Sequence, residues 1–201
     1  TFDAKNASNF YNAGRLYFDL KDYNEAISML SKATTLDKKH VNAYKLKLKS
    51  NIELKDYEKA LKESDAVLAL EQNQTNYYWH AFVHEKFGNY NQAETFLRKS
   101  LDKSPNALET NIALADVLYK AKKYDQSLES CNKALQLDSK STDALWIRSK
   151  VYREKIDYTK AIEDLSRIIY FSPDNEQAFF NRGLYNQEYT KYQDAINDFS
   201  K

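Results

Sequence analysis

Six tyrosines recur at almost constant intervals along the chain, and this periodicity constrains the fold more than any other feature. Their separations are 34, 33, 34, 34 and 34 residues. A period of this length is typical of repeat proteins, in which each repeat is one supersecondary unit stacked on the next. The six are Tyr23, Tyr57, Tyr90, Tyr124, Tyr158 and Tyr192.

The residues that follow each tyrosine place an apolar stripe on a helix. A small residue comes three positions later, and mostly apolar residues come seven and ten positions later. These offsets fall on one face of an α-helix. A short polar turn precedes most of the tyrosines, and a second amphipathic segment precedes the turn, so each repeat is predicted to be helix A, turn, helix B and linker. The small residues are Ala26, Ala60, Ala93, Ser127, Ala161 and Ala195.

The chain is predicted to be one domain, residues 1–201, because a single helix hairpin cannot bury its apolar face whereas stacked hairpins do so together. The last repeat stops inside its second helix, so we expect the sequence to be a fragment of a longer chain. We also expect the uncovered end around Phe199 to favour self-association. The repeats are residues 7–40, 41–73, 74–107, 108–141, 142–175 and 176–201.

Composition excludes several classes of protein. Among 201 residues, 30 basic side chains face 29 acidic ones, and a net charge of +1 argues against a nucleic-acid binder. The chain has no apolar run long enough to cross a membrane. Only 3 glycines and 2 prolines argue against a β-sandwich or barrel. A single cysteine excludes an internal disulfide framework.

The repeat pattern resembles that of the tetratricopeptide repeat (TPR) family, and the resemblance covers nearly the whole chain. Residues 9–36 read NFYNAGRLYFDLKDYNEAISMLSKATTL, and residues 178–200 follow the same pattern. The resemblance implies an all-α fold, a right-handed superhelical α-solenoid of antiparallel helix hairpins. The departures from the pattern are linker prolines at Pro105 and Pro173 alone, and Lys47, Asn51 and Ser64 at usually apolar places.

The resemblance also implies that ligands bind in a concave groove lined by the fifth, ninth and twelfth residues of each repeat. Aromatic side chains are the commonest type there, with basic ones between them, and such a lining suits a peptide with apolar side chains and some acid. The alternative is that the rings pack between adjacent A helices and the charges are solvated. The candidates are Tyr11, Arg15, Phe18, Lys45, Lys49, Tyr78, Phe82, Tyr119, Trp146, Lys150, Arg153 and Phe180.

The best-known ligand site of this family, the carboxylate clamp for chaperone C-terminal tails, is not matched in any register beyond Lys45. We therefore expect no binding of chaperone tails.

Residues that could carry chemistry are few. His80 and His84 are four apart, but no third metal ligand is apparent, and packing is the expected role. Cys131 is expected to be packed and unreactive. Glu163 and Asp164 are adjacent, point in different directions on a helix and are expected to be solvated. No catalytic, cofactor or metal site is predicted, and we expect that the chain is not an enzyme.

These observations favour a non-catalytic protein–protein interaction scaffold that captures a peptide or a partner domain. Two alternatives remain open: an arm of a larger enzyme or signalling protein whose catalytic domain lies elsewhere, and an RNA-binding helical repeat, which the charge balance disfavours. A cytoplasmic location is the default, and a periplasmic or envelope location would follow if a signal peptide had been removed.

Overall fold

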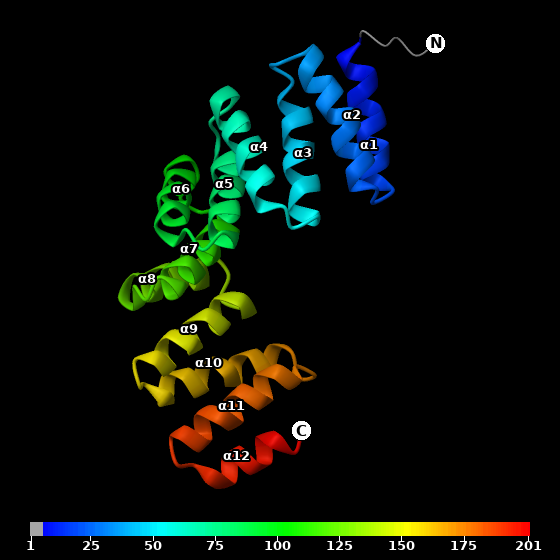
Figure 1. The fold of residues 1–201 in the computed structure, drawn as a ribbon. Coiled ribbons are helices and arrows are strands. Elements are labelled where there is room, and N and C mark those ends of the chain that lie inside the picture. The colour runs from blue at the N-terminus through cyan, green and yellow to red at the C-terminus, as the bar shows by residue number, and fades with distance from the viewer. Residues whose placement is uncertain (1–5) are drawn as a thin grey trace. The chain divides into compact units, whose positions relative to one another are not determined.

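The structure, a computed structural model, describes residues 6–201, and within them it contains twelve helices and no strand. The predicted all-α fold of helix hairpins is confirmed (Figure 1). The helices are α1 (Ala7–Asp19), α2 (Tyr23–Leu36), α3 (Val41–Glu53), α4 (Tyr57–Leu70), α5 (Gln74–Lys86), α6 (Tyr90–Lys103), α7 (Leu108–Lys120), α8 (Tyr124–Leu137), α9 (Thr142–Glu154), α10 (Tyr158–Phe171), α11 (Glu176–Glu188) and α12 (Tyr192–Phe199).

The chain divides into two compact units, unit 1 (Thr1–Ser104) with α1 to α6 and unit 2 (Pro105–Lys201) with α7 to α12. Within each unit every helix packs on the next one along the chain. Odd-numbered helices are the A helices and even-numbered ones the B helices. The A helices α1 and α3 also touch, as do α7 and α9. Positions in a repeat are counted below from the first residue of its A helix.

The turn between helix A and helix B has the same backbone in all six hairpins. Its middle residue has a positive φ, which among the described residues occurs at Lys21, Lys55, Gly88, Lys122, Ile156 and Thr190. The next residue is the N-cap of helix B, and an aspartate there accepts a hydrogen bond from the backbone N–H three residues on, as in Asp56 to Lys59. The turn thereby fixes where each B helix begins.

The small residue three positions after each repeating tyrosine belongs to the packed interior. Each of the six is buried, five with no exposed surface at all. A larger side chain there would force the helices apart, so the periodic alanines follow from packing.

A second pair of positions sets the spacing between helix A and helix B, because a small residue on one helix faces a larger residue on the other. Position 8 of helix A meets position 24 of helix B: a Cβ added to Gly14 would lie 2.6 Å from Cγ of Leu30, and one added to Gly183 would lie 2.6 Å from the ring of Phe199. In the second repeat the sizes are reversed, with Leu48 at position 8 and Ser64 at position 24. Ser64 therefore departs from the family pattern because Leu48 fills the space.

Within residues 6–201, no helix combines the length and the apolar character needed to span a membrane.

Candidate functional site

The predicted binding residues lie on the A helices, and each unit carries one set. The fifth, ninth and twelfth positions are four and three residues apart, so they share one side of a helix. The helix-A face of unit 1 consists of Tyr11, Arg15, Phe18, Lys45, Lys49, Tyr78 and Phe82. The helix-A face of unit 2 consists of Tyr119, Trp146, Lys150, Arg153 and Phe180.

The aromatic rings of unit 1 are partly packed and partly accessible. On α5, the Trp79 ring lies edge-on to Tyr78 at 5.8 Å and to Phe82 at 5.6 Å between centroids. All three are of intermediate exposure. The two alternatives for these positions, packing and ligand contact, are thus compatible. The remaining rings of this face, Tyr11 and Phe18, contact His40 at 4.9 Å and Tyr23 at 5.5 Å.

The cations of unit 1 differ in whether an acid neutralises them. Lys45 donates to Glu71 at 2.5 Å, and Glu71 also accepts from the Asn76 side chain at 3.1 Å. The hydrogen bond from Lys45, followed by that from Asn76, lowers the pKa of Glu71 below its usual value. Lys49 lies with Nζ 6.0 Å from the centre of the Trp79 ring and is exposed. Arg15 is also exposed, and no acidic side chain in residues 6–201 forms an ion pair with Arg15 or Lys49.

On unit 2 the predicted hot spot is assembled only in part. The Lys150 ammonium lies 5.8 Å from the rings of both Trp146 and Tyr119. Arg153 points to another partner: it donates two hydrogen bonds to Glu188, at 3.0 and 2.7 Å. This pairing raises the pKa of Arg153 and lowers that of Glu188.

The aromatic side chains of unit 2 leave accessible apolar surface. A hollow of about 240 Å³ adjoins Trp146 at the start of α9 and the loop before α11. Phe180 is 51% exposed and lies 5.9 Å from Phe199, which is exposed in turn. Self-association through this end stays a prediction, as does the role of each groove residue.

Sequence reasoning was wrong about Asp164. It was expected to be solvated, but it is 2% exposed and accepts two hydrogen bonds from Arg148, at 2.8 and 2.7 Å. The third arm of the Arg148 guanidinium donates to Asn132 on the preceding B helix at 2.7 Å. The arrangement joins α8, α9 and α10, and we call it an arginine clamp.

The next repeat of unit 2 contains a second arginine clamp. Arg182 donates to Asp198 at 3.0 and 2.6 Å and to Ser166 at 3.0 Å. Each of the three residues stands 34 positions after its counterpart in the first clamp. This spacing was the signal that could have identified both clamps in the sequence. Their burial indicates a structural role.

Positions 7 and 23, which form the clamps, hold other pairs in unit 1. In the second repeat Lys47 lies 2.8 Å from Glu63, and the two side chains are 12% and 15% exposed. Lys47 was a departure from the family pattern, and this ion pair explains its presence. In the third repeat the same positions hold His80 and Phe96, whose ring centres are 4.1 Å apart.

The histidine pair of α5 forms a hydrogen-bonded chain whose direction the partners define. The Ser64 hydroxyl donates to the carbonyl of Leu61 at 2.8 Å, so it accepts from Nδ1–H of His80 at 2.8 Å. Nε2 of His80 is then an acceptor, and it lies 3.1 Å from Nε2 of His84, which donates. Nδ1 of His84 remains a buried acceptor without a partner.

This chain requires the His80 imidazole to be neutral, because its Nε2 accepts the hydrogen bond from His84. Burial, with smaller contributions from His84 and Lys99, lowers the pKa of His80 from 6.5 to about 4. Burial also lowers the pKa of His84, although Asp65 opposes the shift. The packing role predicted for the two histidines is thus observed, with polar contacts that the sequence did not reveal.

The side chains that could bind a metal ion or act as a nucleophile do not form a site in the described part of the chain. The described part of the chain contains no cluster of three or more His, Cys, Asp or Glu side chains placed to hold a metal ion. Cys131 is buried, and burial raises the pKa of its thiol to about 12, which keeps it protonated and unreactive at neutral pH.

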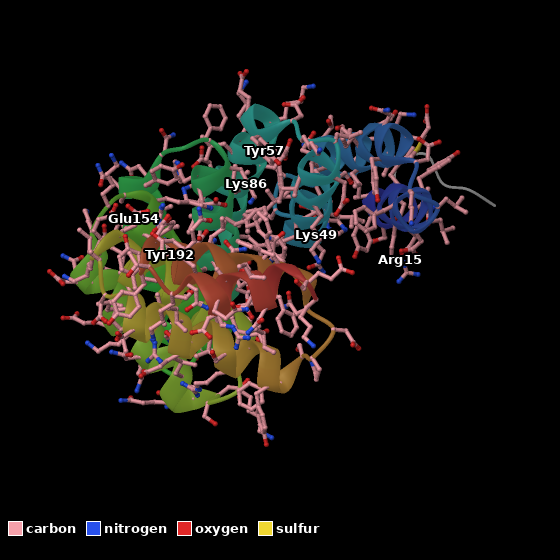
Figure 2. The ribbon with its side chains drawn as sticks, turned by 90° about the horizontal axis from the view of Figure 1, so that it is seen from below. Arg15, Lys49, Tyr57, Lys86, Glu154 and Tyr192 are labelled. Atoms are coloured by element: carbon pink, nitrogen blue, oxygen red, sulfur yellow. The ribbon has the colours of Figure 1, made fainter. Side chains whose placement is uncertain are left out.

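Sequence reasoning also missed a shallow hollow at the turns of unit 1. It has a volume of about 580 Å³ and lies between the turn after α3 and the end of α5, where Tyr57 and Lys86 are labelled in Figure 2. Its apolar lining comes from Leu54, Tyr57 and Phe87. The signal was the exposed apolar residue that ends helix A in each of the first three repeats, Leu20, Leu54 and Phe87.

Comparison with known proteins agrees with this architecture. The family model described as tetratricopeptide repeat matches residues 86–151, and the model described as anaphase-promoting complex, cyclosome, subunit 3 matches residues 1–66. The solved structure of YrrB, a TPR protein with an unusual peptide-binding site, is similar, with a TM-score of 0.76 and 21% identity over 87% of this chain and 90% of that one.

Two curated relatives illustrate the range of similarity. Sperm-associated antigen 1 of Mus musculus is 33% identical over 92 residues, which cover 45% of this chain and 10% of that protein. Anaphase-promoting complex subunit 3 of Schizosaccharomyces pombe is 23% identical over 181 residues, which cover 90% of this chain and 27% of that protein. The chain spans between about a tenth and a third of the length of the curated relatives it matches.

Hairpins of helices that repeat with a constant register define the class of helical-repeat proteins. Within that class, the repeat length, the family models and the similar solved structures identify the chain as a tetratricopeptide repeat protein.

Proposed function

We propose that the chain is a non-catalytic scaffold that captures a peptide segment of a partner protein on its helix-A faces. Tetratricopeptide repeat families are generally scaffolds for protein–protein interaction. The structurally similar YrrB has a peptide-binding site, and the family model matched by residues 1–66 is that of a subunit of a multiprotein complex. Both observations support protein partners for this chain.

The observation that carries the proposal is the side-chain composition of the helix-A faces. Each face combines half-buried aromatic rings with cations that lie over them, as Lys150 lies over Trp146 and Tyr119. Rings held by their neighbours offer apolar area at low entropic cost, and aromatic and arginine side chains dominate the energetics of known interfaces. A solvated helix surface would need neither property.

The test is a selection of random 12-residue peptides displayed on phage against the whole chain. Selected peptides are then synthesised with a fluorescein label, and their affinities are measured by fluorescence anisotropy. We expect Phe82→Ala or Trp146→Ala to weaken binding by about tenfold or more, as is usual for an aromatic hot spot.

The matched control is Tyr170→Ala, which removes an aromatic ring that is 80% exposed on a B helix. It should leave the affinity within about twofold, and all three variants should keep the far-ultraviolet circular dichroism of the parent. Peptides whose binding depends on Tyr170 and not on Phe82 or Trp146 would refute the proposal.

A further inference from the structure

Resting on the proposed function, we infer that the helix-A face of unit 1 selects acidic peptides, whose carboxylates pair with Arg15 and Lys49 while apolar side chains contact the neighbouring rings. This names the chemistry of the partner segment: alternating acidic and apolar or aromatic residues.

Two cationic side chains on the helix-A face of unit 1 are not neutralised by acids in the part of the chain that the structure describes. Several basic side chains of unit 1 are paired with acids, as Lys59 is with Asp56 and Lys62 with Glu58. On the helix-A face, Lys45 is likewise paired with Glu71. Arg15 and Lys49 differ from Lys45 on this face, because none of the acidic side chains of residues 6–201 forms an ion pair with either.

The second step is the placement of these two cations. Both occupy position 9 of an A helix, Arg15 on α1 and Lys49 on α3, and α1 and α3 are in contact. Figure 2 shows both labels on the same side of the unit 1 ribbon, and Tyr57 on the other side. The cations therefore form a short row across adjacent repeats, which an extended or helical segment can follow.

The third step is the apolar surface around the cations. Phe18 lies one turn after Arg15 on the same helix, and Lys49 lies over Trp79. A carboxylate that reaches Lys49 brings its neighbouring side chain against this ring. Charge-assisted hydrogen bonds strengthen when water is partly excluded, and the guanidinium of Arg15 can hold a carboxylate with two of them.

The cations on the helix-A face of unit 2 differ from those on the helix-A face of unit 1. Its arginine at position 12, Arg153, is already neutralised by Glu188 with two hydrogen bonds. Lys150 lies 5.8 Å from each of two rings and is only partly exposed, whereas Lys49 is exposed. We therefore assign the preference for acid to unit 1.

The test uses three fluorescein-labelled peptides that share one set of Phe and Leu residues. The intervening residues are Glu and Asp in the first, Gln and Asn in the second, and Lys and Arg in the third. At 50 mM salt we expect the acidic peptide to bind the full chain about tenfold or more tightly than the amide peptide, and the affinity to fall as salt rises.

Three variants locate the interaction. Arg15→Gln with Lys49→Gln should weaken binding of the acidic peptide by about tenfold. Lys38→Gln with Lys39→Gln removes the same charge from the exposed loop before α3 and should change the affinity by less than about twofold. Glu71→Gln frees Lys45 while keeping an acceptor for Asn76, and should tighten binding by about threefold.

The outcomes separate this inference from the proposed function. If the amide or basic peptide binds best and binding is lost in Phe82→Ala, the helix-A face binds peptides but the preference for acid is refuted. If the two double variants weaken binding equally, the effect is one of net charge and the assignment to Arg15 and Lys49 is overturned. Binding of a single-stranded oligouridine that competes with the acidic peptide and is lost in the Arg15–Lys49 variant would also overturn it, in favour of RNA.

Discussion

Positions 7 and 23 of the repeat carry different kinds of side chain in units 1 and 2. In unit 2, positions 7 and 23 form arginine clamps in two successive repeats, Arg148 with Asp164 and Arg182 with Asp198. In unit 1 they hold Lys47 with Glu63 in one repeat and the neutral His80 beside Phe96 in the next. The backbone of the hairpins is alike in both units, so the fold does not dictate which chemistry occupies these positions.

The difference matters for how each unit responds to its surroundings. A clamp loses a large contribution to the free energy of unfolding when one partner is removed. The histidine chain needs a neutral His80, so it responds to mild acid. Unit 2 is therefore expected to be sensitive to mutation at these positions, and unit 1 to pH.

The largest expected effect comes from breaking a clamp. Arg148→Leu leaves the Asp164 carboxylate buried without its two donors and should lower the free energy of unfolding by about 3–5 kcal/mol. Urea titration followed by circular dichroism measures it.

The matched control comes from the repeat before it, where positions 7 and 23 are Leu114 and Ser130. Arg148→Leu with Asp164→Ser copies that pair and should recover most of the loss, because it removes both charges together. A double variant as unstable as the single one would show that the clamp is not the source of the effect.

The corresponding change in unit 1 should have a smaller effect. Lys47→Leu leaves Glu63 without its partner, but both side chains retain some exposure, at 12% and 15%, so water can solvate the carboxylate. We expect a loss of about 2 kcal/mol in the same urea titration. A loss as large as that of Arg148→Leu would remove the distinction drawn between the two pairs.

Mild acid should lower the free energy of unfolding by about as much as Lys47→Leu does. The pKa of His80 is lowered from 6.5 to about 4 in the folded chain, so between these values the unfolded chain binds more protons. Its contribution is complete above pH 6.5 and is lost as the pH falls toward 4. From pH 7 to pH 5 the free energy of unfolding should decrease by about 2 kcal/mol from this group.

The histidine-free control again comes from the chain itself. Positions 7 and 11, which hold His80 and His84 in the third repeat, hold Leu114 and Leu118 in the fourth. In the variant His80→Leu with His84→Leu, denaturation at pH 7 and at pH 5 should give a much smaller difference. An undiminished pH dependence would place its origin elsewhere.

The smallest effect is expected at an exposed pair of unit 2. Lys155 contacts Asp125 at 2.6 Å, but both side chains are more than a third exposed. Lys155→Gln should change the free energy of unfolding by less than about 1 kcal/mol, and salt should reduce even that. A clear loss at 0.5 M salt would contradict the idea that burial determines which ion pairs matter.

The helices were predictable from the sequence because local patterns determine them: the periodic tyrosine, the small residue three positions later and the polar turn. The clamps were not predicted, because each joins residues 16 apart that meet only when two helices face each other. Asp164 was misjudged for this reason, since a charged residue on a helix is usually solvated. Asn51 is only 1% exposed, and its burial, like the direction of the histidine chain, depends on neighbours that the sequence does not specify.

The paired sizes at positions 8 and 24 have a consequence for how such a chain can change over generations. The second helix of one repeat can replace that of another only where its residue at position 24 complements in size the residue at position 8 that it will face. Transplanting α6 in place of α4, for example, would set Leu97 against Leu48 where Ser64 now leaves room. A whole hairpin carries both members of the pair, so it can be duplicated, shuffled or grafted without repacking at these positions, which makes it the unit in which this architecture grows.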